Sequence, residues 1–223
     1  AGLAYALIGP KDDVLPVRGE TPWTAWRRHL SHPALRAAFA IGFAILFVFV
    51  GVFTYVNLYL TEVLGIEAAA LGLVYLVFLP ALLTTPFAAQ SVSRLGPKRV
   101  FQRSGAAALL GVGLTLVPSI PVVLLGLAII GAGTFFMQAA ATGFVGRTAV
   151  GDRAAANGLY LTSYYIGGLI GAFALGQAYV AAGWTAVALI VGAALALTLL
   201  LAGLLRHPGP EVMARRKMPE PEV

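Results

Sequence analysis

The chain has 223 residues, of which 59% are hydrophobic and 11% are charged, and its formal net charge is +6. Soluble domains contain roughly 45–50% apolar and about 25% charged residues, and a domain of this size could not bury the excess, so a soluble globular fold is excluded. The absence of cysteine excludes disulfides and cysteine-ligated metals. Nucleic acid is not expected as a partner, because the basic residues do not interleave with aromatics on a polar face.

Residues 1–34 are predicted to hold the end of a preceding helix and a cytoplasmic linker. Residues 1–8 are a short apolar run that stops at Gly9 and Pro10, as a helix end would in a longer chain. The alternative is the apolar core of a signal peptide, although no basic segment precedes it.

The linker contains a predicted surface helix at residues 21–30. Thr21 can cap this helix, and Pro22 suits its first position. Its apolar face consists of Trp23, Trp26 and Leu30. The opposite face is basic, with Arg27 and Arg28. We expect this helix to lie on the cytoplasmic leaflet of a membrane. An unstructured basic linker is the alternative.

Six apolar segments are each long enough, at roughly 17–25 residues, to cross a bilayer as a helix. They lack the alternation of barrel strands, and only helices or closed barrels satisfy their backbone in lipid. The predicted spans are residues 35–60, 68–89, 100–117, 121–145, 154–182 and 184–205. They form a predicted bundle at residues 35–206, followed by a Pro-rich, charged cytoplasmic tail at residues 207–223.

The charges divide cleanly between the two sides of this arrangement. Every Lys and Arg falls before or at the entrance of span one, after span two or at the entrance of span three, after span four, or after span six: Lys11, Arg18, Arg27, Arg28, Arg36, Arg94, Lys98, Arg99, Arg103, Arg147, Arg153, Arg206, Arg215, Arg216 and Lys217. The other connections contain only Glu62 and Glu67 as charged residues. The positive-inside rule then predicts both ends in the cytoplasm. Trp184 is expected in the headgroup layer of the opposite face.

The interiors of the predicted spans contain no charged residue or histidine. Intramembrane ionisable groups are retained for function because inserting them is costly, so a proton relay is not evident here. The three histidines, His29, His32 and His207, lie in connections. We therefore expect no enzyme activity, no metal and no cofactor.

Uncharged polar residues are what the spans do contain. The candidates for substrate contact are Asn57, Gln138, Tyr160, Tyr164 and Tyr165. An amide in hydrocarbon needs a partner, so these residues either face a cavity and touch substrate or form hydrogen bonds between helices. Gln138 is the strongest candidate because its neighbours are apolar.

Glycines and a short internal similarity suggest how the spans are arranged. Gly167 and Gly171 form a small-xxx-small pair, which favours close helix packing over a hinge. Residues 72–76 and 158–161 resemble each other about three helices apart, as in a 3+3 inverted repeat. The third and sixth spans are almost wholly aliphatic and are expected to face lipid.

A basic motif follows the second span. Arg94, Gly96, Lys98 and Arg99 match a pattern of the major facilitator superfamily, while Ala89 and Ser93 replace its leading Gly and its Asp. A second, weaker similarity relates residues 157–184 of this chain to the eleventh helix of efflux permeases. Over essentially its whole length, the chain resembles the C-terminal half of a major facilitator transporter of the bacterial efflux, drug/proton antiporter-like branch.

The resemblance implies an all-α membrane protein, with six transmembrane helices as a 3+3 inverted repeat that form one half of a major facilitator fold. It implies transport of a small-molecule substrate by alternating access, most simply as proton-coupled efflux through a bacterial inner membrane. The partners would be protons, membrane lipid and an N-terminal six-helix half, which would hold the coupling carboxylate. The alternative is a non-transporting membrane scaffold or assembly subunit, in which polar residues only join helices and residues 94–99 only bind anionic lipid.

Overall fold

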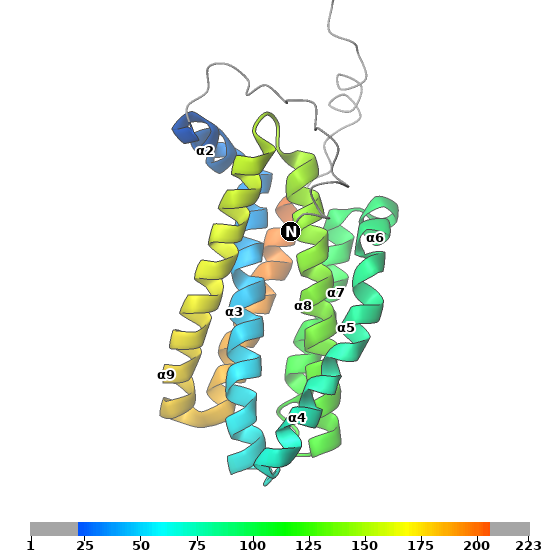
Figure 1. Cartoon of the computed structure of the whole chain (residues 1–223), viewed down its shortest axis with the longest axis vertical. Helices are drawn as coiled ribbons and strands as arrows, with labels where there is room; N and C mark the ends of the chain where they lie inside the picture. Colours follow the sequence, from blue (N-terminus) through cyan, green and yellow to red (C-terminus); the bar gives the residue numbers. More distant parts are fainter. Residues whose placement is uncertain (1–21, 206–223) are drawn as a thin grey trace, which may run out of the picture.

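The computed structural model describes residues 22–205, and within this range the chain is helical without a strand. Its long helices lie side by side along one axis (Figure 1). The elements are α2 (Pro22–Ser31), α3 (Pro33–Glu62), η1 (Ala68–Ala70), α4 (Leu71–Val74), η2 (Tyr75–Phe78), α5 (Leu79–Thr84), η3 (Thr85–Phe87), α6 (Ala88–Leu95), α7 (Pro97–Leu114), α8 (Ile120–Thr148), α9 (Arg153–Leu201) and η4 (Ala202–Leu204). The predicted helix end at residues 1–8, the Thr21 cap and the tail lie outside the described residues.

Three helices are long and apolar enough to cross a membrane: Pro33–Glu62, Ile120–Thr148 and Arg153–Leu204. The first and second correspond to the spans predicted at residues 35–60 and 121–145. The third combines the last two predicted spans. The all-α fold is therefore confirmed, while the count of six spans and the 3+3 repeat remain predictions.

Helix α9 consists of two arms joined by a sharp reversal. Ala182 and Gly183 leave the helical conformation, and Gly183 has a φ of 67°, which L side chains rarely adopt. The arm at residues 153–181 and the arm at residues 184–201 consequently run in opposite directions (Figure 1, yellow and orange). The break predicted at Gly183 is confirmed.

The segment predicted as one helix at residues 68–89 is divided into short α and 3-10 pieces. Pro80 and Pro86 lie in this segment, and proline removes a backbone donor and clashes with the preceding turn. The 3-10 turns η2 and η3 lie directly before Pro80 and around Pro86. The prolines therefore account for the interruptions, and α5 still packs along α8.

Glycines allow the helices to approach at backbone distance. A Cβ at Gly171 of α9 would lie 2.6 Å from the Phe47 carbonyl oxygen of α3, and one at Gly167 would overlap the Phe43 backbone. A Cβ at Gly111 of α7 would lie 2.7 Å from a carbonyl oxygen of α8. Such contacts are typical of membrane helix pairs, where close packing drives association. The packing interpretation of Gly167 and Gly171 is confirmed.

The two ends of the bundle differ in charge. The α6–α7 and α8–α9 turns and α2 lie at one end, and the α3–α4 connection and the bend of α9 lie at the other (Figure 1). The first end contains Arg94, Lys98 and Arg99, whereas the second contains Glu62 and Glu67. The segregation seen along the sequence is thus also a separation in space.

Helix α2 spans the predicted surface segment, so the unstructured alternative is wrong for residues 22–31. Its Ala25 and His29 are buried, and His29 Nε2 lies 2.8 Å from the Asp152 carbonyl oxygen in the α8–α9 turn. Trp23 and Trp26 point outward, with 66% and 44% of their surface exposed. Helix α2 is therefore docked on the bundle with an apolar face left open.

Trp184 is the one predicted interface tryptophan whose ring is inside the bundle. It is 6% exposed and stacks on Tyr59 with ring centroids 5.4 Å apart. Its Nε1 donates to the carbonyl and hydroxyl oxygens of Thr115, each at 3.2 Å. The ring is therefore packed inside the bundle, where a partner for the indole N–H exists at the end of α7, and its expected level at the headgroups stays a prediction.

Candidate functional site

The hydrogen bond between Tyr160 and Gln138 joins the first arm of α9 to α8. The Tyr160 hydroxyl donates to Gln138 Oε1 at 2.5 Å, and the tyrosine is only 1% exposed. Its ring lies against Gly42 of α3, where an added Cβ would come within 2.5 Å of the ring. Tyr160 therefore lies beneath the surface and positions the Gln138 amide instead of lining an opening itself.

A small cavity adjoins the Gln138 amide. Its volume is about 20 Å³, enough for roughly one water molecule. The lining residues are Ile45, Phe49, Thr134, Phe135, Gln138 and Tyr164. The Thr134 hydroxyl donates to the carbonyl oxygens of Ile130 and Gly131. The Gln138 amide and the Tyr164 phenol are therefore the side-chain polar groups of this lining that an occupant could meet.

Three tyrosines lead from this buried point to the outside of the bundle. The Tyr160 and Tyr164 rings stack with centroids 6.2 Å apart, and Tyr165 meets Tyr164 edge-on at 5.5 Å. Tyr165 is 65% exposed. The three predicted tyrosines are thus brought together with Gln138, at three different depths.

A cluster of aromatic rings beside the cavity was not predicted from the sequence. Phe53 and Phe78 have centroids 4.5 Å apart, Phe49 and Phe135 are 5.2 Å apart, and Tyr75 lies 6.0 Å from Phe78. These rings come from α3, η2 and α8. Only the Phe49–Phe53 and Tyr75–Phe78 spacings of four and three residues were signals in the sequence, because the other contacts join distant segments.

Asn57 belongs to the far end of this cluster and does not meet Gln138. Its Nδ2 donates to the Tyr75 hydroxyl and to the Phe53 carbonyl oxygen, both at 3.1 Å. Tyr75 is about half exposed. The predicted candidates therefore form two polar points, one at Asn57 and Tyr75 and one at Gln138 and Tyr164, with aromatic rings between them.

We call this whole surface the aromatic face. It comprises Phe49, Phe53, Asn57, Tyr75, Phe78, Phe135, Gln138, Tyr164 and Tyr165. Its chemistry is that of packing and of a few neutral hydrogen bonds, and π faces also attract cations. No group of three metal-ligating side chains occurs in the described part of the chain. The face therefore suits an apolar, aromatic or weakly cationic molecule.

The basic motif lies away from the aromatic face, at the turn between α6 and α7. Arg94 is in the last turn of α6, and Lys98 and Arg99 are exposed in the first turn of α7. Gly96 between them has φ 80° and ψ 155°, a region almost restricted to glycine. Cations at a helix N-terminus oppose the helix dipole, so Lys98 and Arg99 do not stabilise α7 through it.

The helical bundle, its apolar helices and its small-residue contacts define a multi-pass membrane protein. Sequence comparison agrees with this class. The model of the Major Facilitator Superfamily matches residues 2–149 and 70–222. The chain belongs to this family, which is one of transporters.

Two curated relatives of the chain are also named as transporters. The chain is 27% identical over 143 residues to an uncharacterized transporter of Buchnera aphidicola subsp. Schizaphis graminum (strain Sg). The aligned region covers 64% of the chain and 35% of the relative. The chain is 29% identical over 140 residues to the uncharacterized MFS-type transporter YybF of Bacillus subtilis (strain 168), covering 62% of the chain and 35% of the relative. The chain thus spans about a third of the length of the curated relatives it matches.

Proposed function

We propose that this chain is the C-terminal six-helix half of a secondary transporter, and that the aromatic face is one wall of its substrate pathway. The observation that carries the proposal is where the rings and neutral polar groups of the aromatic face gather, with Tyr75, Phe135 and Tyr165 exposed among them. They come from α3, η2, α8 and the first arm of α9, whereas α7 and the second arm of α9 contribute none. Ordinary helix-to-helix hydrogen bonds would not need one shared open face.

The proposed topology has six spans, arranged as a 3+3 inverted repeat with both ends in the cytoplasm. Counting the two arms of α9 separately, and adding α7 and residues 68–95, brings the three long helices to six. The basic end, with α2 and the α6–α7 turn, would then face the cytoplasm. A bacterial inner membrane is the proposed location.

Transport is proposed to be proton-coupled efflux by alternating access. Among residues 22–205, the carboxylates of Glu62, Glu67 and Asp152 all lie at a helix end or in a turn, so no carboxylate of this part could carry a proton at mid-membrane. The coupling acid would belong to an N-terminal six-helix half. A neutral aromatic wall fits a lipophilic substrate, which is the class that an efflux pump of this kind would expel.

A second candidate is a membrane scaffold whose polar residues only join helices. The Tyr160–Gln138 hydrogen bond favours it, as does the bond from the Tyr55 hydroxyl to the Ala172 carbonyl oxygen, because both link helices inside the bundle. The two candidates differ in whether water and substrate reach the aromatic face.

Cysteine accessibility in the full-length protein separates the candidates. Phe135→Cys and Tyr165→Cys place thiols on the aromatic face, and Leu189→Cys is a control on the second arm of α9, where Leu189 is 65% exposed. A charged, water-soluble methanethiosulfonate reagent is expected to modify the first two thiols and not the third. Lipophilic dyes that the full-length protein expels should slow both reactions. If all three thiols stay unreactive, the aromatic face is closed to water, which contradicts the transport proposal and favours the scaffold.

A further inference from the structure

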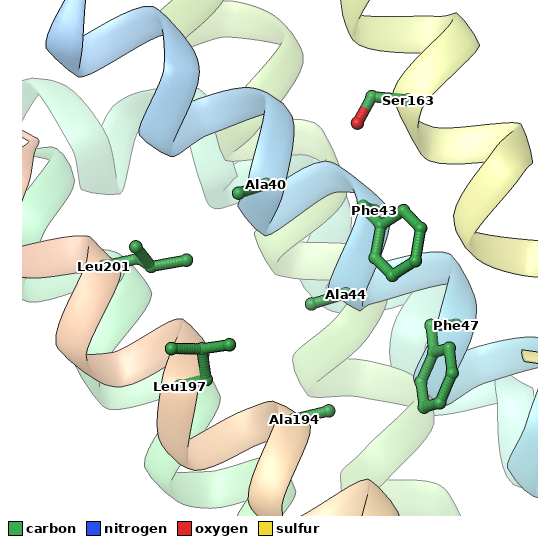
Figure 2. Close-up of a pocket in the computed structure, with 8 residues that line it drawn as sticks. All are labelled: Ala40, Phe43, Ala44, Phe47, Ser163, Ala194, Leu197 and Leu201. Atoms are coloured by element: carbon green, nitrogen blue, oxygen red, sulfur yellow. The ribbon is translucent and has the colours of Figure 1, made fainter.

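An apolar groove of about 430 Å³ lies between α3 and the two arms of α9 (Figure 2). Phe43 and Phe47 of α3 form one wall, and Leu197 and Leu201 of the second arm face them. Ser163 of the first arm is the polar side chain in the lining, and its hydroxyl already donates to the Phe39 carbonyl oxygen at 2.9 Å. The groove therefore offers an occupant hydrocarbon contacts and few hydrogen bonds.

The groove follows from how tightly the first arm of α9 meets α3. At Gly167 and Gly171 the two backbones touch, so the Phe43 and Phe47 rings cannot lie between the helices and turn sideways. They stack on each other with centroids 6.1 Å apart. Ala194 on the facing arm is too small to fill the space opposite. An unfilled apolar void loses dispersion contacts, so a groove open to lipid favours a hydrocarbon chain inside it.

A cation lies in line with the groove at the basic end of the bundle. Arg36 is four residues before Ala40, which lines the groove, and residues four apart share a helix face. The Arg36 side chain is exposed, and no described residue forms a hydrogen bond or an ion pair with it. At this end Asp152 is the acidic residue among those described, and its Oδ1 accepts the Ala155 N–H as a helix cap.

Helix α2 indicates that Arg36 lies at headgroup depth. It ends at Ser31, just before α3 begins at Pro33, and it contacts both α3 and α9. Its outward-facing Trp23 and Trp26 are side chains that prefer the membrane–water interface. Arg36, in the first turn of α3, is therefore close to the level at which lipid phosphates are found.

We propose that this groove binds an anionic phospholipid, with one acyl chain between α3 and α9 and the phosphate at Arg36. The rise from Ala40 to Phe47 is about 10 Å, which accommodates part of an acyl chain next to the headgroup. Arginine pairs well with phosphate, and anionic lipids concentrate in the cytoplasmic leaflet. The choice of leaflet rests on the proposed topology, whereas lipid binding as such does not require transport.

The test is photo-crosslinking of the full-length protein in vesicles that contain a phosphatidylglycerol or a phosphatidylcholine with a diazirine on the acyl chain. Mass spectrometry of the labelled peptides locates the adducts. We expect phosphatidylglycerol to label residues 40–47 and 194–201 more than phosphatidylcholine does. Arg36→Gln should lower phosphatidylglycerol labelling about fivefold and leave phosphatidylcholine labelling unchanged, since a cation near the surface contributes roughly that factor.

A second set of variants tests the proposal by filling the groove. Ala40→Trp and Leu197→Trp add bulk at exposed lining positions and should remove labelling by both lipids. Arg103→Gln and Leu189→Trp are the matched controls, with exposed residues away from this groove, and should change nothing there. The proposal is overturned if Arg36→Gln leaves the lipid preference intact, or if the groove stays unlabelled because another part of the chain covers it. Neither result depends on whether the protein transports.

Discussion

Gln138 is the residue whose partners distinguish a binding site from a structural contact. Its Oε1 accepts a hydrogen bond from the buried Tyr160 hydroxyl, and the residue also lines a cavity with room for about one water. The same side chain can therefore join two helices and present a donor to substrate. The two interpretations made from the sequence are not exclusive at this residue.

Tyr160→Phe is expected to destabilise the protein by about 0.5–1.5 kcal/mol, because it removes one interhelical hydrogen bond and leaves the Gln138 carbonyl unpaired. Thermal unfolding of the full-length protein in mild detergent measures this change. Tyr165→Phe is the control, since Tyr165 is 65% exposed, and it should leave the unfolding temperature unchanged. Gln138→Leu combined with Tyr160→Phe should cost less than the sum of the single changes. Strict additivity would argue against the hydrogen bond.

At the scale of elements, the contact between α3 and the first arm of α9 organises the fold. The contact between α3 and the whole of α9 is the most extensive between two elements in the described chain, and at the first arm it depends on glycines of α9 lying on the α3 backbone. The same contact buries the Tyr160 ring against Gly42 and turns the Phe43 and Phe47 rings toward the apolar groove. The aromatic face and the groove therefore both depend on one helix pair.

Gly171→Ala is expected to destabilise the bundle by about 1–3 kcal/mol, because its Cβ would lie 2.6 Å from the Phe47 carbonyl oxygen and the helices would have to separate. Gly158→Ala, on the same arm, has nothing within 4 Å of the added Cβ and is the matched control. Unfolding in detergent compares the two variants. Equal stability of both would contradict the close approach of α9 to α3.

At the scale of the whole molecule, the distribution of charge predicts the orientation in the membrane. The basic turns and α2 lie at one end of the bundle, and Glu62 and Glu67 lie at the other. Short loops rich in Lys and Arg are kept on the cytoplasmic side during insertion, whereas the apolar interior of the bundle carries no such preference.

Single cysteines at Glu67 and Ser93, which are exposed at opposite ends, test this orientation. A membrane-impermeant maleimide added to intact cells is expected to label the cysteine at position 67 and not the one at position 93. Permeabilised cells should show labelling at both positions, which controls for reactivity. Labelling of the cysteine at position 93 in intact cells would reverse the proposed topology.

The sequence alone determined the features that depend on local chemistry. Apolar length predicted α3 and α8, the glycine between two apolar segments predicted the break at Gly183, and the basic residues predicted which turns share an end. Each of these follows from a property of one segment in water or lipid. The small-residue pair at Gly167 and Gly171 likewise predicted close packing, because only glycine permits backbone contact.

Tertiary structure decided everything that requires segments distant in the chain to meet. The sequence could not place Trp184 inside the bundle, because its hydrogen-bond partner Thr115 lies 69 residues away. It could not join Asn57 to Tyr75, nor gather Phe49, Phe78 and Phe135 into one aromatic face. Hydrophobic periodicity reports only which side chains avoid water, and in a chain soluble in lipid nearly all of them do. Which side chains touch is settled by helix packing, and so the candidate site became visible only in the folded bundle.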